Sequence, residues 1–513
     1  MRTNIFTLLL ILNHLESVSQ EQNNGFTNSL QKQIQAGGIR ISYLEVNMPA
    51  EEANLGLMGF HSNVEFFNKL YAGIGLFSSV AGERGGLFTL GINTGFKQRL
   101  YHSLYLDVNL VFGGGGGGHS PVGGGAFINP KIGIYYNKSG ILAGVHYSYF
   151  DFFSGDIASP GISYFIEIPL KLKFASYNKM NQYAINQGKE PYESWNESAT
   201  VSTFICRFDN FFPFGSSEYT FGEKINKNLH LVGFEYEHFL KKNIFLFFHA
   251  DGAYKGFRSG FMDFFVGAGV SFFSSRNFYM VPRIAFGGGG GGRIQTGGGL
   301  LIYPSLNLEQ KISTNFSISE NGGFLITPFG SFKALSAGIS LKYNLCMGGT
   351  LNPFSGTALN SYHFFGLQFI IENQSYLKAA LHYVAPENTQ LLSLQINADI
   401  GKRFYIAGQT AFAYLGQSGG YAEGLFGIGI HSSPLLNDKL QFIFNGMTGI
   451  GGGGNIPTEQ GFIIKPTGGI KYYLGDQIAL YTSVGKIYSP FGKLNSWSFS
   501  GGVVYAFSVL TGR

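Results

Sequence analysis

The sequence predicts an all-β fold in which antiparallel strands close into a barrel, and three observations support this prediction. The composition is rich in Gly (75 of 513 residues) and in aromatic residues (51 Phe and 29 Tyr), and only 13% of the residues are charged. Ordinary soluble domains carry about 25% charged residues and about 7% Gly. Many segments alternate between an apolar face and a small or polar face, as half-buried strands do. Gly-rich or short polar links separate these segments, as strands joined by tight turns require.

The alternation is clearest in the segments 497–509 and 162–174. In the first, the apolar face carries Trp497, Phe499, Val503, Tyr505 and Phe507, and the other face carries Ser498, Ser500, Val504, Ala506 and Ser508. Segment 104–112 and the apolar stripe Met262, Phe264, Val266, Ala268, Val270 and Phe272 behave alike. Strands of about ten residues with one greasy face are typical of membrane barrels, but a soluble β-sandwich alternates too.

The two ends of the chain favour the membrane. Arg2, the apolar run 5–12 and the small residues at 17–19 predict a signal peptide over 1–19, with cleavage near Gln20. Beyond it no run of 18 apolar residues exists, so no transmembrane helix is expected. The last strand closes on Tyr505-Ala506-Phe507, which resembles the aromatic-terminated final strand of bacterial outer-membrane β-barrel proteins, although six residues follow Phe507. The resemblance implies the bacterial outer membrane as location and membrane lipid as surroundings.

An internal triplication is the most specific feature of the sequence. Apolar residues lead into the Gly runs 113–118, 287–292 and 451–454, and a Pro follows the last Gly of each run by 12 residues, at Pro130, Pro304 and Pro466. This spacing predicts three homologous modules of ~165 residues with about eight strands each. In the first module we expect strands near 39–49, 55–63, 70–80, 87–97, 103–113, 125–136, 141–150 and 162–174.

The domain prediction follows from these repeats. It places the signal peptide at 1–19, module 1 at 20–175, a polar linker or periplasmic insert at 176–228, module 2 at 229–345 and module 3 at 346–513. About 22–24 strands could close once into a large barrel or three times into tandem eight-stranded barrels. We favour one large barrel, because three closures in one chain are an unusual topology. The Gly-rich links are expected to face outward and the charged links inward.

The Gly runs are candidate sites with two interpretations. The residues concerned are Gly113, Gly118, Gly123, Gly287, Gly292, Gly297, Gly451 and Gly454. As hairpins of bare backbone they could present a close-approach surface to a glycan, an anion or a partner's strand. The mechanical interpretation, which we favour, is that Gly permits the bends and bulges that barrel corners need.

Charged residues that should face the inside of the barrel form a second candidate set: Asp107, Lys131, Glu167, Lys171, Lys173 and Asp263. They could line a permeation path, or they could form an internal salt-bridge network that holds a filled barrel closed. The two interpretations carry equal weight.

Several other functions are disfavoured. A net charge of +5 without basic runs gives no footprint for nucleic acid. No metal spacing and no cofactor motif is present, and Cys206 and Cys346 could be bonded or free. The sequence Gly416–Gly420 satisfies G-x-S-x-G but lies between strand-like flanks. His61 and Ser62 are adjacent and should point to opposite faces. We therefore expect no enzyme, and in particular no supported residue set for a lipid-modifying one.

The leading functional hypothesis is a passive or partner-gated pore for small hydrophilic solutes. The alternative is a non-conducting structural or interaction barrel, whose Gly-rich hairpins dock a surface lipoprotein or a subunit of a secretion machinery.

Overall fold

The computed structural model describes residues 32–67, 69–138, 140–177, 195, 197–256, 260–275, 277–313, 315–349, 362–382 and 384–512. These residues form 25 antiparallel strands and no α-helix. Among them, no helix is long and apolar enough to cross a membrane. The expected signal peptide at 1–19 and its cleavage near Gln20 lie outside the described residues.

The first eight strands close into one barrel, here called barrel 1. β1 pairs with β2 on one side and with β8 on the other, and the strands between them pair in chain order. The strands are β1 (Gln33–Val46), β2 (Leu55–Phe66), β3 (Leu70–Ala81), β4 (Phe88–Tyr101), β5 (Leu104–Gly116), β6 (Ala126–Lys138), β7 (Ile141–Phe152) and β8 (Ala158–Ser176). They match the eight strands expected for the first module to within a few residues at each end.

Barrel 2 closes in the same way between β9 and β17. β12 and β13 both pair with β14 and together form one interrupted strand, so this barrel also has eight strand positions. The strands are β9 (Thr200–Pro213), β10 (Leu229–Phe239), β11 (Ile244–Lys255), β12 (Met262–Val270), β13 (Phe272–Ser275), β14 (Phe278–Gly290), β15 (Leu300–Lys311), β16 (Phe316–Ile326) and β17 (Lys333–Met347).

Barrel 3 closes between β18 and β25 over 16 residue pairs. Its strands are β18 (Tyr362–Ala379), β19 (Glu387–Ile400), β20 (Phe404–Leu415), β21 (Ala422–His431), β22 (Leu440–Gly452), β23 (Phe462–Tyr473), β24 (Ile478–Tyr488) and β25 (Asn495–Gly512).

The preference for one large barrel was therefore wrong, and the tandem arrangement of three eight-stranded barrels is observed. Each first strand bonds its own eighth strand over 12 to 16 residue pairs. Between barrels, strand pairing is confined to isolated positions, such as Met347 with Thr511 and Phe507 with Ser176. An eight-stranded cylinder is just wide enough for its inward side chains to fill it, which makes each closure a packed unit. Common ancestry of the three units stays a prediction.

The start of the second unit also needs correction. β9 (Thr200–Pro213) lies inside the segment 176–228 that was expected to be a linker, and it pairs with both β10 and β17. Its alternation is real, with exposed Phe204, Phe208 and Phe212 on one face, but the other face carries the charged Arg207 and Asp209, which hid it. The unit starting at 229 would lack the strand that closes it.

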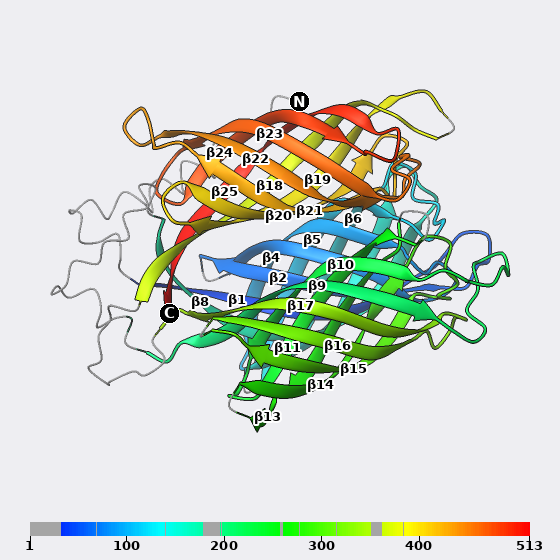
Figure 1. Cartoon of the computed structure of the whole chain (residues 1–513), viewed down its shortest axis with the longest axis horizontal. Helices are drawn as coiled ribbons and strands as arrows, with labels where there is room; N and C mark the ends of the chain where they lie inside the picture. Colours follow the sequence, from blue (N-terminus) through cyan, green and yellow to red (C-terminus); the bar gives the residue numbers. More distant parts are fainter. Residues whose placement is uncertain are drawn as a thin grey trace.

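The three barrels lie side by side and each touches both others, with barrel 3 at the top of Figure 1 and barrel 2 at the bottom. The contacts follow a cyclic rule. β5 lies against β20, β14 against β3, and β22 against β11. Counted within each barrel, the fifth strand of one barrel always contacts the third strand of another. Such head-to-tail contacts close into a ring of three.

Apolar side chains fill the region where the three barrels meet. Met58, Val80, Phe88 and Leu90 of barrel 1, Phe264 of barrel 2 and Phe412 of barrel 3 form one buried cluster. The ring of Phe60 stacks on that of Phe248 at 4.8 Å between centroids. The apolar stripe Met262–Phe272 thus faces this junction at Phe264, whereas its far end, Phe272, is exposed.

The outward faces elsewhere carry exposed apolar side chains, as the alternation predicted. In β8, Ile162, Tyr164, Ile166 and Ile168 are exposed, while Ser163, Phe165 and Glu167 are buried inside. In β25, Trp497, Phe499 and Val503 are exposed and Ser498, Ser500 and Ser508 are buried. The apolar face therefore points away from the barrel axis.

Candidate functional site

The interior of barrel 1 holds a compact ion-pair network around Arg40. The guanidinium lies 2.7 Å from Asp107 and 2.7 Å from Glu167. Lys97 Nζ lies 2.7 Å from Glu167, and His146 Nε2 lies 3.1 Å from Asp107. All five side chains are almost fully buried. The network ties β1, β4, β5, β7 and β8 together across the barrel.

The six candidate lumen residues do not line one path. Asp107 and Glu167 are joined through Arg40, and Lys131 lies buried in the same barrel with its Nζ 4.9 Å from the centre of the Phe77 ring. Asp263 lies inside barrel 2 and is fully buried. The other two residues, Lys171 and Lys173, lie outside the network near the end of β8, where Lys171 is exposed. Burial and ion pairing of Asp107 and Glu167 support the salt-bridge interpretation.

Lys173 instead binds the segment that leads to barrel 2. Its Nζ lies 2.5 Å from Glu197, and Lys32 Nζ lies 2.7 Å from the other carboxylate oxygen. The hydrogen bonds from Lys173 and Lys32 lower the pKa of Glu197 to about 2. This contact lies at the end of barrel 1 opposite the Gly-rich hairpins.

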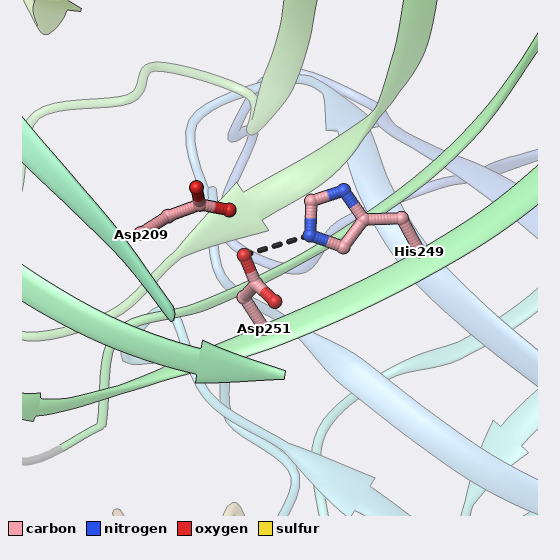
Figure 2. Close-up of side chains that lie close together, drawn as sticks. All are labelled: Asp209, His249 and Asp251. Carbon is pink, nitrogen blue, oxygen red and sulfur yellow. Dashed lines mark ion pairs between the residues drawn. The ribbon is translucent and has the colours of Figure 1, made fainter. Parts of the chain in front are cut away.

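Barrel 2 has its own interior network. Arg207 lies 2.7 Å from Asp209 and 2.8 Å from Glu235, and Arg283 lies 2.5 Å from Glu235. Further along the axis, Lys342 lies 3.2 Å from Glu237 and 2.8 Å from Glu309. Near Asp209, His249 and Asp251 form a separate group (Figure 2).

In barrel 3 one lysine organises the interior. Lys465 Nζ lies 2.6 Å from Gln374, 2.9 Å from Tyr376, 2.9 Å from Gln409 and 3.1 Å from Glu423. All five side chains are buried. The three interiors thus share a plan, with buried charges bonded to one another, but use different residues.

Sequence reasoning missed most of these residues. Arg40, Arg207, Glu235, His249 and Lys465 are all charged or ionisable residues on the inward register of their strands. The signal was available, because His249 and Asp251 stand two apart in an otherwise apolar strand, and so do Glu235 and Glu237. Which of them meet was not available, because partners lie on strands far apart in sequence.

Some Gly residues of the Gly-rich hairpins lie in turns, and others lie where another part of the chain approaches closely. Gly118, Gly292 and Gly454 have φ of 58°, 59° and 51°. The residue after each, His119, Arg293 and Asn455, also has positive φ. Two consecutive left-handed residues make the tight hairpin turns that Gly favours. These backbone angles are what the mechanical interpretation requires.

The strand parts of the first two Gly runs are close-approach surfaces, and the surface they meet is another barrel of the same chain. A Cβ on Gly114 would lie 2.6 Å from the carbonyl oxygen of Ala413 in barrel 3. A Cβ on Gly288 would overlap the Ser78 hydroxyl in barrel 1. The Gly85 amide also donates a hydrogen bond to the Gly297 carbonyl at 2.9 Å. These faces are covered within the chain.

The other Gly positions contact their own barrel. A Cβ on Gly113, Gly123, Gly287 or Gly451 would meet atoms of neighbouring strands or loops in the same barrel. A Cβ on Gly419 of barrel 3 would also lie 2.1 Å from the Gly123 carbonyl oxygen. Docking of another molecule on the Gly-rich hairpins therefore stays a prediction. It applies only to those hairpin atoms that the neighbouring barrels do not cover.

The remaining sequence features have structural roles. Cys206 and Cys346 are free thiols. His61 faces the interior, with Nε2 3.3 Å from the Ser42 hydroxyl, and Ser62 lies exposed on the other face, as predicted. Ser418 lies in the loop between β20 and β21 and donates to Thr389 at 3.0 Å. No nucleophile elbow forms there, because β20 and β21 flank the loop.

Comparisons with known proteins find likenesses only among solved structures. No protein-family model and no curated protein matches the chain. Among solved structures it is similar to the ferric enterobactin receptor of Pseudomonas aeruginosa, with 9% identity over 93% of this chain and 82% of that one, at a TM-score of 0.28. It is also similar to Pseudomonas aeruginosa OpdQ, with 7% identity over 93% of this chain and 98% of that one, at 0.21.

A third similar structure covers a much smaller part of this chain. A de novo designed transmembrane β-barrel matches 28% of this chain over 97% of its own length, with 14% identity and a TM-score of 0.19. TM-scores this low carry no argument about function. The strand pairings themselves define the chain as a β-barrel protein.

Proposed function

We propose that the protein is a non-conducting, three-barrel structural protein of the bacterial outer membrane. The observation that carries this proposal is that three separately closed barrels have charged interiors filled by bonded side chains, while their outward faces are apolar. A chain in water would place these residue types the other way round. In a bilayer, closed barrels leave no strand edge unpaired and present an apolar band to lipid.

The filled interiors argue against the pore hypothesis. Arg40, Asp107 and Glu167 cross the barrel 1 interior at hydrogen-bonding distances, and Lys465 does the same in barrel 3. The junction between the barrels is occupied by aromatic and aliphatic side chains. A hydrated solute would have to break these contacts to pass. We propose no catalytic role.

Planar-bilayer recording of the purified mature chain tests this function. We expect no stable conductance steps at salt concentrations and voltages where a porin incorporated in parallel conducts. Reproducible steps that disappear when the protein is omitted would overturn the proposal and restore the pore.

The membrane location has its own test. Fractionation of envelopes on a density gradient should place the chain in the outer-membrane fraction, and extraction should need detergent. A mature chain that stays monodisperse in buffer without detergent would contradict the location. A lipoprotein or secretion-machinery partner remains a proposal, and it would need a surface other than Gly114 or Gly288, which the neighbouring barrels cover.

A further inference from the structure

The interior of barrel 2 carries more negative charge than those of its neighbours. Its buried charged residues are Arg207, Arg283 and Lys342 against Asp209, Glu235, Glu237, Asp251 and Asp263. In barrel 1, Arg40, Lys97 and Lys131 stand against Asp107 and Glu167, and in barrel 3, Lys465 and Lys471 stand against Glu372, Asp399 and Glu423. Unpaired buried carboxylates are strongly destabilising, so they are normally paired or bind metal.

The cations of barrel 2 are engaged elsewhere. Among the described residues, the ion pairs of Arg207 go to Asp209 and Glu235, those of Arg283 to Glu235, and those of Lys342 to Glu237 and Glu309. None of them reaches Asp251 or Asp263. Both carboxylate oxygens of Asp263 are buried and lack a hydrogen-bond partner within the described part of the chain, and so do both oxygens of Asp251.

Two carboxylates and one imidazole lie close together inside barrel 2. One ligand atom each from Asp209, His249 and Asp251 lies within 4.8 Å of the others, and Figure 2 shows the three groups turned toward one another. His249 Nε2 lies 2.7 Å from Asp251 Oδ2, yet the two atoms are not aligned for a hydrogen bond. Adjacent ligand atoms that each lie ~2.1 Å from one metal ion are separated by about 3 Å.

Asp263 lies beside this group on the neighbouring strand. It stands directly opposite Asp251 in the β11–β12 pair, and both side chains are buried inside the barrel. Side chains of directly opposed residues start about 5 Å apart at Cβ, so both carboxylates reach the same space.

In barrel 3, a lysine side chain neutralises the buried carboxylate at the position equivalent to Asp263. Its β20–β21 pair places Glu423 opposite Ala411, as β11–β12 places Asp263 opposite Asp251. There the ammonium of Lys465 lies 3.1 Å from Glu423. In β15, Tyr303 occupies the position that Lys465 has in β23, because each directly precedes the Pro of the sixth strand, Pro304 or Pro466. Tyr303 bonds Ser336 at 2.7 Å and brings no charge.

We propose that barrel 2 binds one divalent metal ion through Asp209, His249 and Asp251, with Asp263 as the fourth ligand. Three carboxylates and one imidazole suit a borderline ion such as Zn²⁺ or Mn²⁺. The ion replaces, inside barrel 2, the positive charge that Lys465 provides inside barrel 3. Because the ligands come from β9, β11 and β12, binding is coupled to closure of the barrel.

The test uses the full mature chain, purified from membranes without chelators. Elemental analysis should find about one Zn or Mn per chain, and less than a tenth of that would overturn the proposal. Refolding in detergent with EDTA, followed by addition of Zn²⁺ or Mn²⁺, should raise the folding equilibrium constant by roughly 100-fold at a metal concentration 100 times Kd. Stability that responds to pH but not to either metal would mean that protons satisfy the carboxylates, and would also overturn it.

Two variants keep the test decisive if removal of a ligand prevents folding. Tyr303→Lys places an ammonium where Lys465 stands in barrel 3, so it should abolish metal binding and make folding insensitive to EDTA. Glu423→Gln, which changes the barrel 3 counterpart of Asp263, should leave the metal content of the chain unchanged. A Tyr303→Lys chain that keeps its metal would contradict the site. These outcomes do not depend on whether the protein conducts.

Discussion

The contact between barrels 1 and 2 and the contact between barrels 2 and 3 solve one packing problem in opposite ways. In the first, Gly288 of β14 faces the Ser78 hydroxyl of β3, and a Cβ on Gly288 would overlap it. In the second, Ile450 of β22 occupies the position that Gly288 has in β14. Each directly precedes the Gly that pairs with an inward acid on the fourth strand, Asp263 in barrel 2 and Glu423 in barrel 3. It faces Gly252, whose added Cβ would lie 3.7 Å from Ile450 Cδ1.

The difference shows that each of these contacts has a Gly on one of its two strands, but that the Gly can lie on either strand. Gly in a strand interior allows another backbone or a side chain to approach closely. In the first contact, where the fifth strand carries Gly288, the third strand supplies the small side chain of Ser78. Where the third strand carries Gly, the fifth strand supplies a larger one. The volume at the contact, rather than the residue at either position, is what the fold preserves.

The largest expected effect comes from breaking the tighter contact. Gly288→Leu should destabilise the chain by about 1–3 kcal/mol or more, because the side chain has to enter space held by Ser78 and by the Ser79 carbonyl. Chemical unfolding in detergent measures it. The control is Gly446→Leu on the equivalent strand of barrel 3, where an added Cβ meets nothing within 4 Å. Equal stability of the two variants would contradict a close contact at Gly288.

A smaller effect should come from exchanging volume across the looser contact. Gly252→Leu crowds Ile450 but begins from an ordinary van der Waals separation, so it should cost less than Gly288→Leu. The double variant Gly252→Leu with Ile450→Gly moves the large side chain to the other strand and should recover part of the loss. A double-mutant cycle should give a coupling of about 0.5–3 kcal/mol. Strictly additive losses would show that the two residues do not share one space.

The strands and their facing could be predicted from sequence because they depend on local patterns. Alternation correctly separates the buried face from the exposed one in 162–168 and 497–508, but not near the end of β8, where Lys171 is exposed and Phe174 is buried. The Gly runs mark the fifth strand of each barrel, and Pro130, Pro304 and Pro466 all lie in the sixth. These features repeat every two residues or at a fixed spacing, so they can be read along one chain.

Closure could not be predicted, because it depends on pairs that no local pattern reports. Whether β8 returns to β1 or continues to β9 is decided by hydrogen bonds between segments far apart in the chain. The interior charges hold the relevant information, since Arg40 of β1 meets Glu167 of β8. In the sequence, however, Arg40 is a single charge more than 100 residues from its partner. The metal ligands of barrel 2 were missed for the same reason, apart from Asp263.

The contact between barrel 1 and the segment preceding barrel 2 should also respond to acid, with the smallest of these effects. At the end opposite Gly288, Glu197 accepts hydrogen bonds from Lys173 and Lys32, and these lower its pKa from the ordinary 4.5 to about 2. Because the folded state holds the carboxylate more strongly than the unfolded chain does, the stabilisation is complete above pH 4.5. It is lost as the pH falls through about 2.

The measurement compares the unfolding midpoints of the wild type and of Glu197→Gln between pH 7 and pH 2. The difference should be constant above pH 5 and should shrink toward zero below it. It should be small throughout, because the Glu197 side chain is 49% exposed and exposed ion pairs are weak and screened by salt. A difference that persists unchanged at pH 2 would show that Glu197 contributes through packing rather than charge. That result would leave the Gly288 contact as the stronger of the two ties between barrels 1 and 2.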